Sequence, residues 1–270
     1  IVATTSLTNN SSFTTYREFT EASRFSPDAA VYRDKIYWGT KNEGFLADFF
    51  YQHGGLYPTD DWVKKNTASI AHANCAGLDL SPVALEVYRD KLYAILISDP
   101  SVAGHPITRL YTYDAATNVE TCYRSTDLTL PSGFADFNSI AAMSVYRNKL
   151  YIGVGNATCD VLSSTNGTSW TKEFSFSTMS SPMTECRSTY RMMSRGDKLY
   201  FNFWTNRFGA NPVQLYQYNG TTASSLQPPN IGTVGAFPYP NLGNGWVWYN
   251  DSLYVAGITN LIWKYENGAW

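Results

Sequence analysis

The sequence lacks any apolar stretch of the roughly 18 residues that a membrane-spanning helix needs, so we expect no membrane insertion. It also lacks the charged start and apolar middle of a signal peptide, and because it begins at Ile1 rather than Met, we expect a processed chain. Lys and Arg are scattered and the formal charge is −2. Without a basic patch, nucleic acid is not an expected partner.

Motifs for metal binding and for nucleophilic catalysis are missing too. The four cysteines show neither a CxxC motif nor the Cys and His spacing that zinc sites need. His53, His72 and His105 belong to no motif with a serine or cysteine nucleophile, and no glycine-rich phosphate loop is present. We therefore expect no metal and no cofactor.

What the sequence does contain is a short phrase that occurs five times and ends in a tyrosine. It reads VYRDKIY, VYRDKLY, VYRNKLY, SRGDKLY and WYNDSLY, and its last residues, the repeat tyrosines, are Tyr37, Tyr93, Tyr151, Tyr200 and Tyr254. The intervals of 56, 58, 49 and 54 residues fit one blade of a β-propeller. The 16 residues after Tyr254 and the 37 residues up to Tyr37 together make 53, so one further period is split between the two ends.

Each phrase predicts a tight turn between two strands, and a tyrosine-rich third strand and a fourth strand follow in most repeats. The expected inner strands cover residues 29–32, 84–88, 141–146, 189–194 and 245–249. The fold class is therefore all-β, with a single five-bladed β-propeller of four-stranded antiparallel blades over residues 1–270. An N-terminal strand, residues 1–7 or 13–19, is expected to pair with the C-terminal blade and close the ring.

Cysteines and sequons favour a secreted, extracellular glycoprotein. Sequential neighbours lie on the same or adjacent blades, so Cys75 with Cys122 and Cys159 with Cys186 are the expected disulfides, although four buried thiols are the alternative. Six asparagines precede x-Ser/Thr and are candidate glycosylation sites: Asn9, Asn10, Asn156, Asn166, Asn219 and Asn250. Asn-Gly steps also favour hairpin turns, which is a second explanation for two of these sequons.

The KLY strand, the tyrosine-rich strand after it and the NGxxW-like turn of residues 166–170 together resemble kelch-like repeats and five-bladed propellers of tachylectin type. The resemblance covers essentially the whole chain. A tachylectin-type propeller implies a lectin, whose partners are glycans or glycoproteins.

Candidate carbohydrate-binding residues lie in the loops of one propeller face. An amide or carboxylate recurs five or six residues after each repeat tyrosine, at Asn42, Asp99, Asn156, Asn206 and Asn260. Such groups pair with sugar hydroxyls, and repetition permits multivalent capture, although Asn and Asp also simply suit turns. Aromatic residues on the same loops could stack on sugar rings or fill gaps between blades. The candidates are Phe134, Phe137, Trp204, Phe208, Phe237 and Tyr239.

These patterns predict a non-catalytic, lectin-like propeller. Glu86 is the one acid on the expected inner strands, which argues against a glycosidase with two carboxylates near the axis. Two alternatives stay open. The first is a structural subunit of an extracellular filament or coat, in which copies of the chain bind one another. The second is a five-bladed, glycosidase-like enzyme.

Overall fold

The computed structural model describes 19 stretches of the chain. These are residues 2–3, 14–15, 23–25, 29–33, 35–39, 41–42, 48–52, 62–66, 72–76, 78, 80–98, 107–132, 134, 140–154, 159–175, 186–205, 213–226, 246–256 and 262–270. The chain divides into two compact units, Ile1–Tyr123 and Arg124–Trp270, and each is described by itself.

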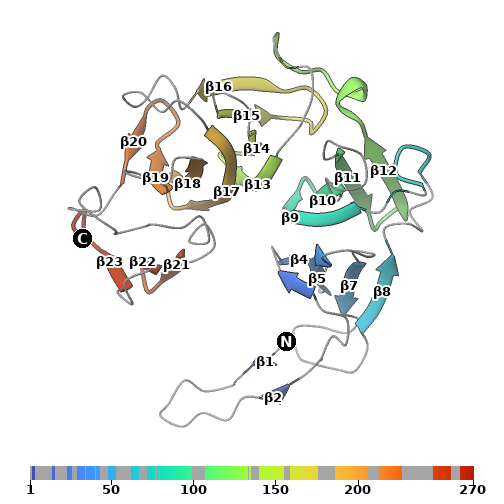
Figure 1. Ribbon diagram of the computed structural model, residues 1–270, viewed down its shortest axis with the longest axis horizontal. Helices are drawn as coiled ribbons and strands as arrows, with labels where there is room; N and C mark the ends of the chain where they lie inside the picture. The colour runs from blue at the N-terminus through green and yellow to red at the C-terminus, as the bar shows by residue number, and fades with distance from the viewer. Residues whose placement is uncertain are drawn as a thin grey trace. The chain divides into compact units, whose positions relative to one another are not determined.

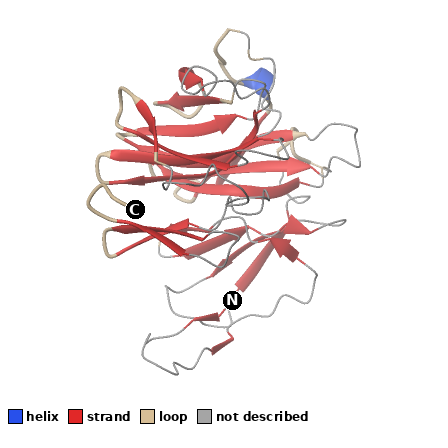
Figure 2. Ribbon diagram, turned by 60° about the vertical axis from the view of Figure 1, so that its left-hand side comes forward, coloured by secondary structure: helices blue, strands red, loops and turns tan. Residues whose placement is uncertain are grey.

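Regular structure is almost entirely β-strand, as Figure 2 shows. The first unit contains β1 (Val2–Ala3), β2 (Thr14–Thr15), β3 (Ser23–Phe25), β4 (Ala29–Tyr32), β5 (Lys35–Gly39), β6 (Lys41–Asn42), β7 (Asp48–Gln52), β8 (Trp62–Asn66), β9 (Leu80–Tyr88), β10 (Lys91–Ser98), β11 (Thr108–Asp114) and β12 (Val119–Tyr123). The second unit contains the short 3-10 helix η2 (Ser125–Asp127), β13 (Ile140–Tyr146), β14 (Lys149–Val154), β15 (Asp160–Ser164), β16 (Thr171–Ser175), β17 (Cys186–Arg195), β18 (Lys198–Thr205), β19 (Val213–Tyr218), β20 (Ala223–Ser225), β21 (Trp246–Tyr249), β22 (Ser252–Ala256) and β23 (Ile262–Tyr265).

Each copy of the repeated phrase builds one antiparallel sheet, labelled in Figure 1. Repeats 1 to 4 are the four-stranded sheets β4-β5-β7-β8, β9-β10-β11-β12, β13-β14-β15-β16 and β17-β18-β19-β20. Repeat 5 is the sheet β21-β22-β23. The all-β class and the four-stranded antiparallel sheets are therefore confirmed, and the five expected inner strands coincide with β4, β9, β13, β17 and β21.

Closure of a five-bladed ring stays a prediction. Within the described residues, β1 pairs with β2 and β3 pairs with β6. The expected pairing of an N-terminal strand with repeat 5 is not among the strand pairs of this part of the chain. No helix of the described residues has the length and apolarity to cross a membrane.

The repeated phrase folds as a two-residue hairpin turn, as predicted. In repeat 2, Tyr88 pairs with Lys91, and the two residues between them, Arg89 and Asp90, have φ of 48° and 57°. Positive φ at both central residues matches the right-handed twist of the flanking strands. Repeat 4 instead has a glycine, Gly196, at the first central position of the turn, with φ of 58°. Glycine at this position is typical of the type II′ turn, the other turn that is favoured in two-residue hairpins.

The tyrosine in the middle of the phrase joins one repeat to the next. The Tyr32 hydroxyl of repeat 1 donates to the main-chain oxygen of Asp90 in the turn of repeat 2 at 2.7 Å, and it accepts from the Ala115 amide at 3.0 Å. The equivalent Tyr146 of repeat 3 donates to the main-chain oxygen of Asp197 in repeat 4 at 2.5 Å. We call each such contact between consecutive repeats a joint.

Aromatic clusters fill the joints. In the first unit, the rings of Tyr32 and Tyr37 lie 6.3 Å and 6.4 Å from that of Tyr113 on the third strand of repeat 2. Repeats 3 and 4 repeat this arrangement, and their cluster consists of Tyr146, Tyr151 and Tyr218. Each joint core is thus built by the residues of the repeated phrase, and a third core lies between repeats 4 and 5 around Trp246.

Candidate functional site

The predicted ligand loops leave each sheet from the end opposite the repeat turn, which we call the rim end. In repeat 2, Leu92 next to the turn pairs with Tyr113, whereas Ile97 far from the turn pairs with Thr108, where the third strand begins. The second strand ends and the third begins at the rim end, so the loop between them belongs there.

Most of the predicted carbohydrate-binding residues lie outside the described residues: Asp99, Asn156, Asn206, Asn260, Phe208, Phe237 and Tyr239. Phe137 does too, whereas Phe134 is described and half-buried. Asn42 and Trp204 lie in strands rather than in loops. Asn42 pairs with Ser23 in a short ladder, and Trp204 pairs with Val213 near the end of β18. Aromatic residues favour extended strands, which explains why β18 continues to Thr205.

Strand register identifies a different recurrent position at the rim end. In repeats 1 to 4, the repeat tyrosine pairs with a residue of the third strand, and the position meant here lies three residues before that partner, near the start of the third strand. We call this position the rim row. Its members in repeats 1 to 4 are Asp48, Arg109, Asp160 and Gln214. Each unit therefore carries two polar residues at equivalent places of its sheets.

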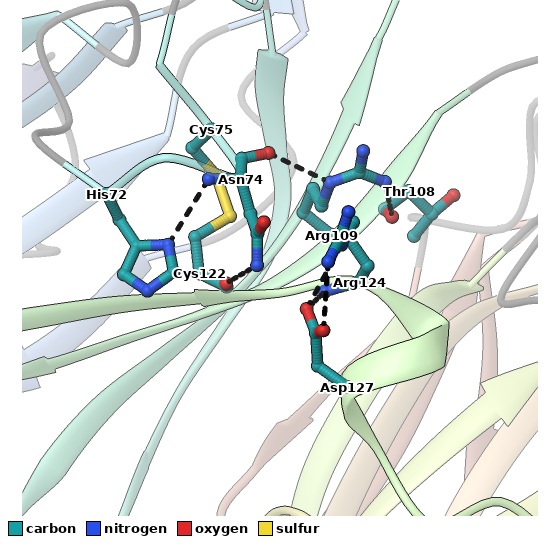
Figure 3. Close-up of a disulfide and its surroundings, with 8 residues drawn as sticks. All are labelled: His72, Asn74, Cys75, Thr108, Arg109, Cys122, Arg124 and Asp127. Atoms are coloured by element: carbon teal, nitrogen blue, oxygen red, sulfur yellow. Dashed lines mark hydrogen bonds and ion pairs between the residues drawn. A yellow bond between two sulfur atoms is a disulfide. The ribbon is translucent and has the colours of Figure 1, made fainter.

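Arg109 connects the rim row to the segment that enters repeat 2 (Figure 3). Its Nε donates to the main-chain oxygen of Asn74 at 3.1 Å, and the Asn74 side chain donates to the main-chain oxygen of Cys122 at 3.0 Å. His72 Nδ1 accepts from the main-chain N–H of Asn74 at 3.3 Å. A guanidinium, an amide and an imidazole, all half-buried, therefore surround the Cys75–Cys122 disulfide.

Asp160 occupies the same register position in repeat 3 and is the one charged residue among the buried residues that the structure describes. Its carboxylate accepts a hydrogen bond from the Ser175 hydroxyl and lies 3.8 Å from Lys172 Nζ. A buried carboxylate is retained only with such partners. The Lys172 side chain is about half exposed, so Asp160 holds a positively charged ammonium group at the rim end.

Glu173 is a second engaged carboxylate of repeat 3, and it belongs to the joint with repeat 4. Its Oε1 accepts from Lys149 at 2.8 Å and from Ser163 at 2.5 Å, while its Oε2 accepts from the Tyr218 hydroxyl at 3.2 Å. Burial alone would raise the pKa of Glu173, but these hydrogen bonds outweigh burial and the pKa is lowered. Burial and the nearby Glu173 charge raise the pKa of Tyr218 to about 12.

Arg124 and Asp127 form a compact ion pair at 3.3 Å across η2, and the Asp127 carboxylate also accepts from the Arg124 amide at 2.8 Å (Figure 3). These bonds cap the short helix and leave both side chains partly exposed. Among the described residues, no group of three or more His, Cys, Asp and Glu could hold a metal ion.

The structure contains the expected disulfide between Cys75 and Cys122. Cys159 is disulfide-bonded as well, and the side chain of its predicted partner, Cys186, lies outside the described part. Three sequon asparagines, Asn166, Asn219 and Asn250, lie exposed in turns. The other three, Asn9, Asn10 and Asn156, lie outside the described residues, so glycosylation stays a prediction.

No protein-family model matches this chain, and no curated protein matches it. Solved structures do match. The endosialidase of phage phi92 superposes with a TM-score of 0.58 at 10% identity over 86% of this chain and 50% of that chain. The extracellular domain of a hybrid two-component system from B. thetaiotaomicron gives a TM-score of 0.51 at 10% identity over 88% of this chain and 26% of that one. An α-L-arabinofuranosidase from Clostridium thermocellum gives a TM-score of 0.48 at 14% identity over 85% of this chain and 80% of that chain.

These likenesses concern the fold, because the identities are far below a quarter. The chain is similar in fold to the propeller-like endosialidase structure and to the extracellular domain, and it spans half or less of each of these two chains. The fold and the comparisons together define the class: an all-β, propeller-like protein made of four-stranded antiparallel sheets. The finer resemblance to kelch-like and tachylectin-type repeats stays a prediction.

The prediction that this protein is not an enzyme is contradicted, because a structure named as an endosialidase shares its fold. That prediction counted acids only on the inner strands, where Glu86 is half-buried and accepts from the Val87 amide. Asp160 and Glu173 show that repeat 3 carries carboxylates on its third and fourth strands. The count on the inner strands was therefore no ground for excluding catalysis.

Proposed function

We propose that this protein recognises carbohydrate at the rim end of its sheets. The observation that carries the proposal is the superposition on a protein named as a phage endosialidase, over 86% of this chain. The chain covers 50% of that protein, so what is proposed is sugar recognition and not its particular reaction.

The chemistry of the rim end supports the proposal. Arg109 and Asn74 hold the segment of residues 72–76 against repeat 2, and the disulfide fixes the same segment covalently. Rigid loop bases keep neighbouring polar groups in fixed positions, which is what recognition of sugar hydroxyls requires. His72 is half-buried beside this base, and the predicted amide Asn206 directly follows β18 in the sequence.

We further propose that the protein acts outside the cell. The Cys75–Cys122 disulfide and the second disulfide at Cys159 support this location, because disulfides persist in oxidising compartments. An extracellular place also fits the exposed sequons, which would then carry glycans.

The test is a glycan array that includes sialylated and neutral glycans, combined with an assay for released reducing sugar on every glycan that binds. We expect saturable binding that weakens in His72→Ala and in Asn206→Ala. Arg89→Ala is the matched control, because Arg89 is exposed in the repeat turn at the opposite end of repeat 2.

Binding that survives both rim substitutions but fails in the Arg89 control would place recognition at the wrong end and overturn the assignment. An array without any bound glycan would overturn the function itself. Release of sugar from a bound glycan would extend the proposal to catalysis, and it would direct the search for carboxylates to the loops of the rim end.

A further inference from the structure

Three turns of the second unit contain the dipeptide Asn-Gly, and each follows the third strand of its repeat. In repeats 3, 4 and 5 these pairs are Asn166-Gly167, Asn219-Gly220 and Asn267-Gly268. A fourth such pair, residues 244–245, lies outside the described residues. Glycine has no side chain to shield its main-chain nitrogen, so an asparagine before it can react with that nitrogen. Each turn is therefore a candidate site of self-modification.

The reaction is an attack of the glycine main-chain nitrogen on the side-chain carbonyl carbon of the asparagine. A new C–N bond forms, the bond to Nδ2 breaks, and Nδ2 leaves as ammonia together with the proton of the glycine N–H. Water then opens the cyclic imide at either of its carbonyl groups, which gives aspartate or isoaspartate. The attack requires the asparagine side chain to rotate until Cγ lies against the glycine nitrogen.

In repeat 3, hydrogen bonds hold both reacting groups in place. Asn166 Oδ1 accepts from the main-chain N–H groups of Thr168 at 2.9 Å and of Ser169 at 2.8 Å. The N–H of Gly167, which carries the attacking nitrogen, donates to Ser164 Oγ at 2.8 Å, and the Ser164 hydroxyl donates to Asn166 Oδ1 at 3.1 Å. Rotation of the Asn166 side chain breaks its bonds, so this turn is protected.

Repeat 4 holds its asparagine in the same way. Asn219 Oδ1 accepts from the main-chain N–H groups of Thr221 at 2.9 Å and of Thr222 at 2.8 Å. The Arg147 guanidinium packs against Gly220 and leaves no room for a side chain there. This asparagine is therefore protected too.

The turn of repeat 5 is shorter, and this removes the protection. Glu266 and Ala269 exchange two main-chain hydrogen bonds, at 2.9 Å and 3.0 Å, and the two residues between them have φ of 52° and 84°. The Ala269 N–H is used in this pair, so it does not hold Asn267 Oδ1 as Thr168 holds Asn166. Among the described residues, the Asn267 side chain and the Gly268 N–H have no hydrogen-bond partner.

We propose that Asn267 is the one asparagine of these three turns that readily converts itself to aspartate and isoaspartate. The product weakens the hairpin that contains it. A new carboxylate lies beside Glu266, whose own carboxylate accepts from Ser252 Oγ at 2.9 Å. Isoaspartate also adds an atom to the main chain of a two-residue turn, so the pair of Glu266 and Ala269 loses its geometry.

Peptide mapping by mass spectrometry measures the converted fraction of each asparagine in protein that is produced without N-glycans and kept at neutral pH. Two hydrogen bonds from main-chain N–H groups must break at Asn166 and at Asn219, so we expect both to react about 30-fold more slowly than Asn267. In guanidinium, which unfolds the chain, the three rates should become similar, because only the fold separates these turns.

Ser164→Ala is the matched variant, since it removes the hydroxyl that holds the Gly167 N–H and the Asn166 side chain. It should accelerate conversion at Asn166 by about fivefold or more, the factor for one hydrogen bond, and leave the rate at Asn267 unchanged. Equal rates in the folded protein, or a slower reaction at Asn267 than in the other two turns, would overturn the proposal. A difference that persists in guanidinium, or an unchanged rate at Asn166 in the variant, would overturn it as well.

Discussion

The joints predict how much stability is lost when the middle tyrosine of the repeated phrase loses its hydroxyl group, and the loss should follow the number of hydrogen bonds that this hydroxyl makes. Removing the Tyr32 hydroxyl in Tyr32→Phe eliminates two hydrogen bonds, one to the main-chain oxygen of Asp90 and one from the amide of Ala115. A hydrogen bond contributes about 1 kcal/mol net, so we expect a loss of about 2 kcal/mol in the free energy of unfolding. Tyr146→Phe eliminates the single bond to Asp197 and should lose about 1 kcal/mol.

Tyr249→Phe supplies the control within the same repeated position, because the Tyr249 side chain is exposed. Its cost should stay within about 0.5 kcal/mol, as for most surface substitutions. Guanidinium titration followed by tryptophan fluorescence, at a protein concentration where every variant is monomeric, measures all three. For Tyr32→Phe, the loss corresponds to a melting temperature lowered by roughly 4 to 8 °C. Equal losses in the free energy of unfolding for the three variants, or a Tyr32→Phe protein as stable as the wild type, would refute the idea that the tyrosine hydroxyl stabilises the joint.

Three further predictions concern the disulfide and the charged pairs. Cys75→Ser opens a loop of sequence separation 47 and should lower the free energy of unfolding by about 4 kcal/mol, measured by denaturant titration under non-reducing conditions. Because the pKa of Glu173 is lowered in the folded state, its contribution is present above the unfolded pKa and is lost as the pH falls through the folded pKa. Wild type should therefore lose more stability than Glu173→Gln between about pH 5 and pH 2, and parallel curves would contradict the Lys149 pairing. Arg195→Ala breaks a highly exposed pair with Asp251 and should lower the free energy of unfolding, measured by denaturant titration, by no more than about 0.5 kcal/mol, so a larger loss would show that this contact is not a simple surface pair.

The sheets could be predicted from the sequence because the repeated phrase keeps its spacing inside the hairpin. Turn residues and strand alternation sit at fixed offsets from each repeat tyrosine, so the inner strands ending at Tyr32, Tyr88 and Tyr146 follow from local rules. The expected disulfide of Cys75 likewise required only that sequential neighbours share a sheet region.

The rim row could not be found by counting from the repeat tyrosines, because the loops that precede it differ in length. The distance from repeat tyrosine to rim row is 11 residues for Asp48, 16 for Arg109, 9 for Asp160 and 14 for Gln214. Strand register aligns these residues, but an offset of five or six instead selects turn-forming amides. A search backwards from the third-strand residues would have found Arg109 and Asp160, since those strands have recognisable tyrosines and serines.

The middle tyrosine of each joint binds a main-chain oxygen, and this has a consequence for how such a chain can change over generations. The acceptor is present whatever side chain the turn carries, so Asp90 and Asp197 serve equally although one turn contains Arg89 and the other Gly196. This hydrogen bond therefore depends on the backbone shape of the neighbouring turn and not on its side chains. When a repeat is duplicated or exchanged, the turn sequence can change without loss of this bond, whereas the aromatic residue at the position of Tyr113 and Tyr218 must be kept.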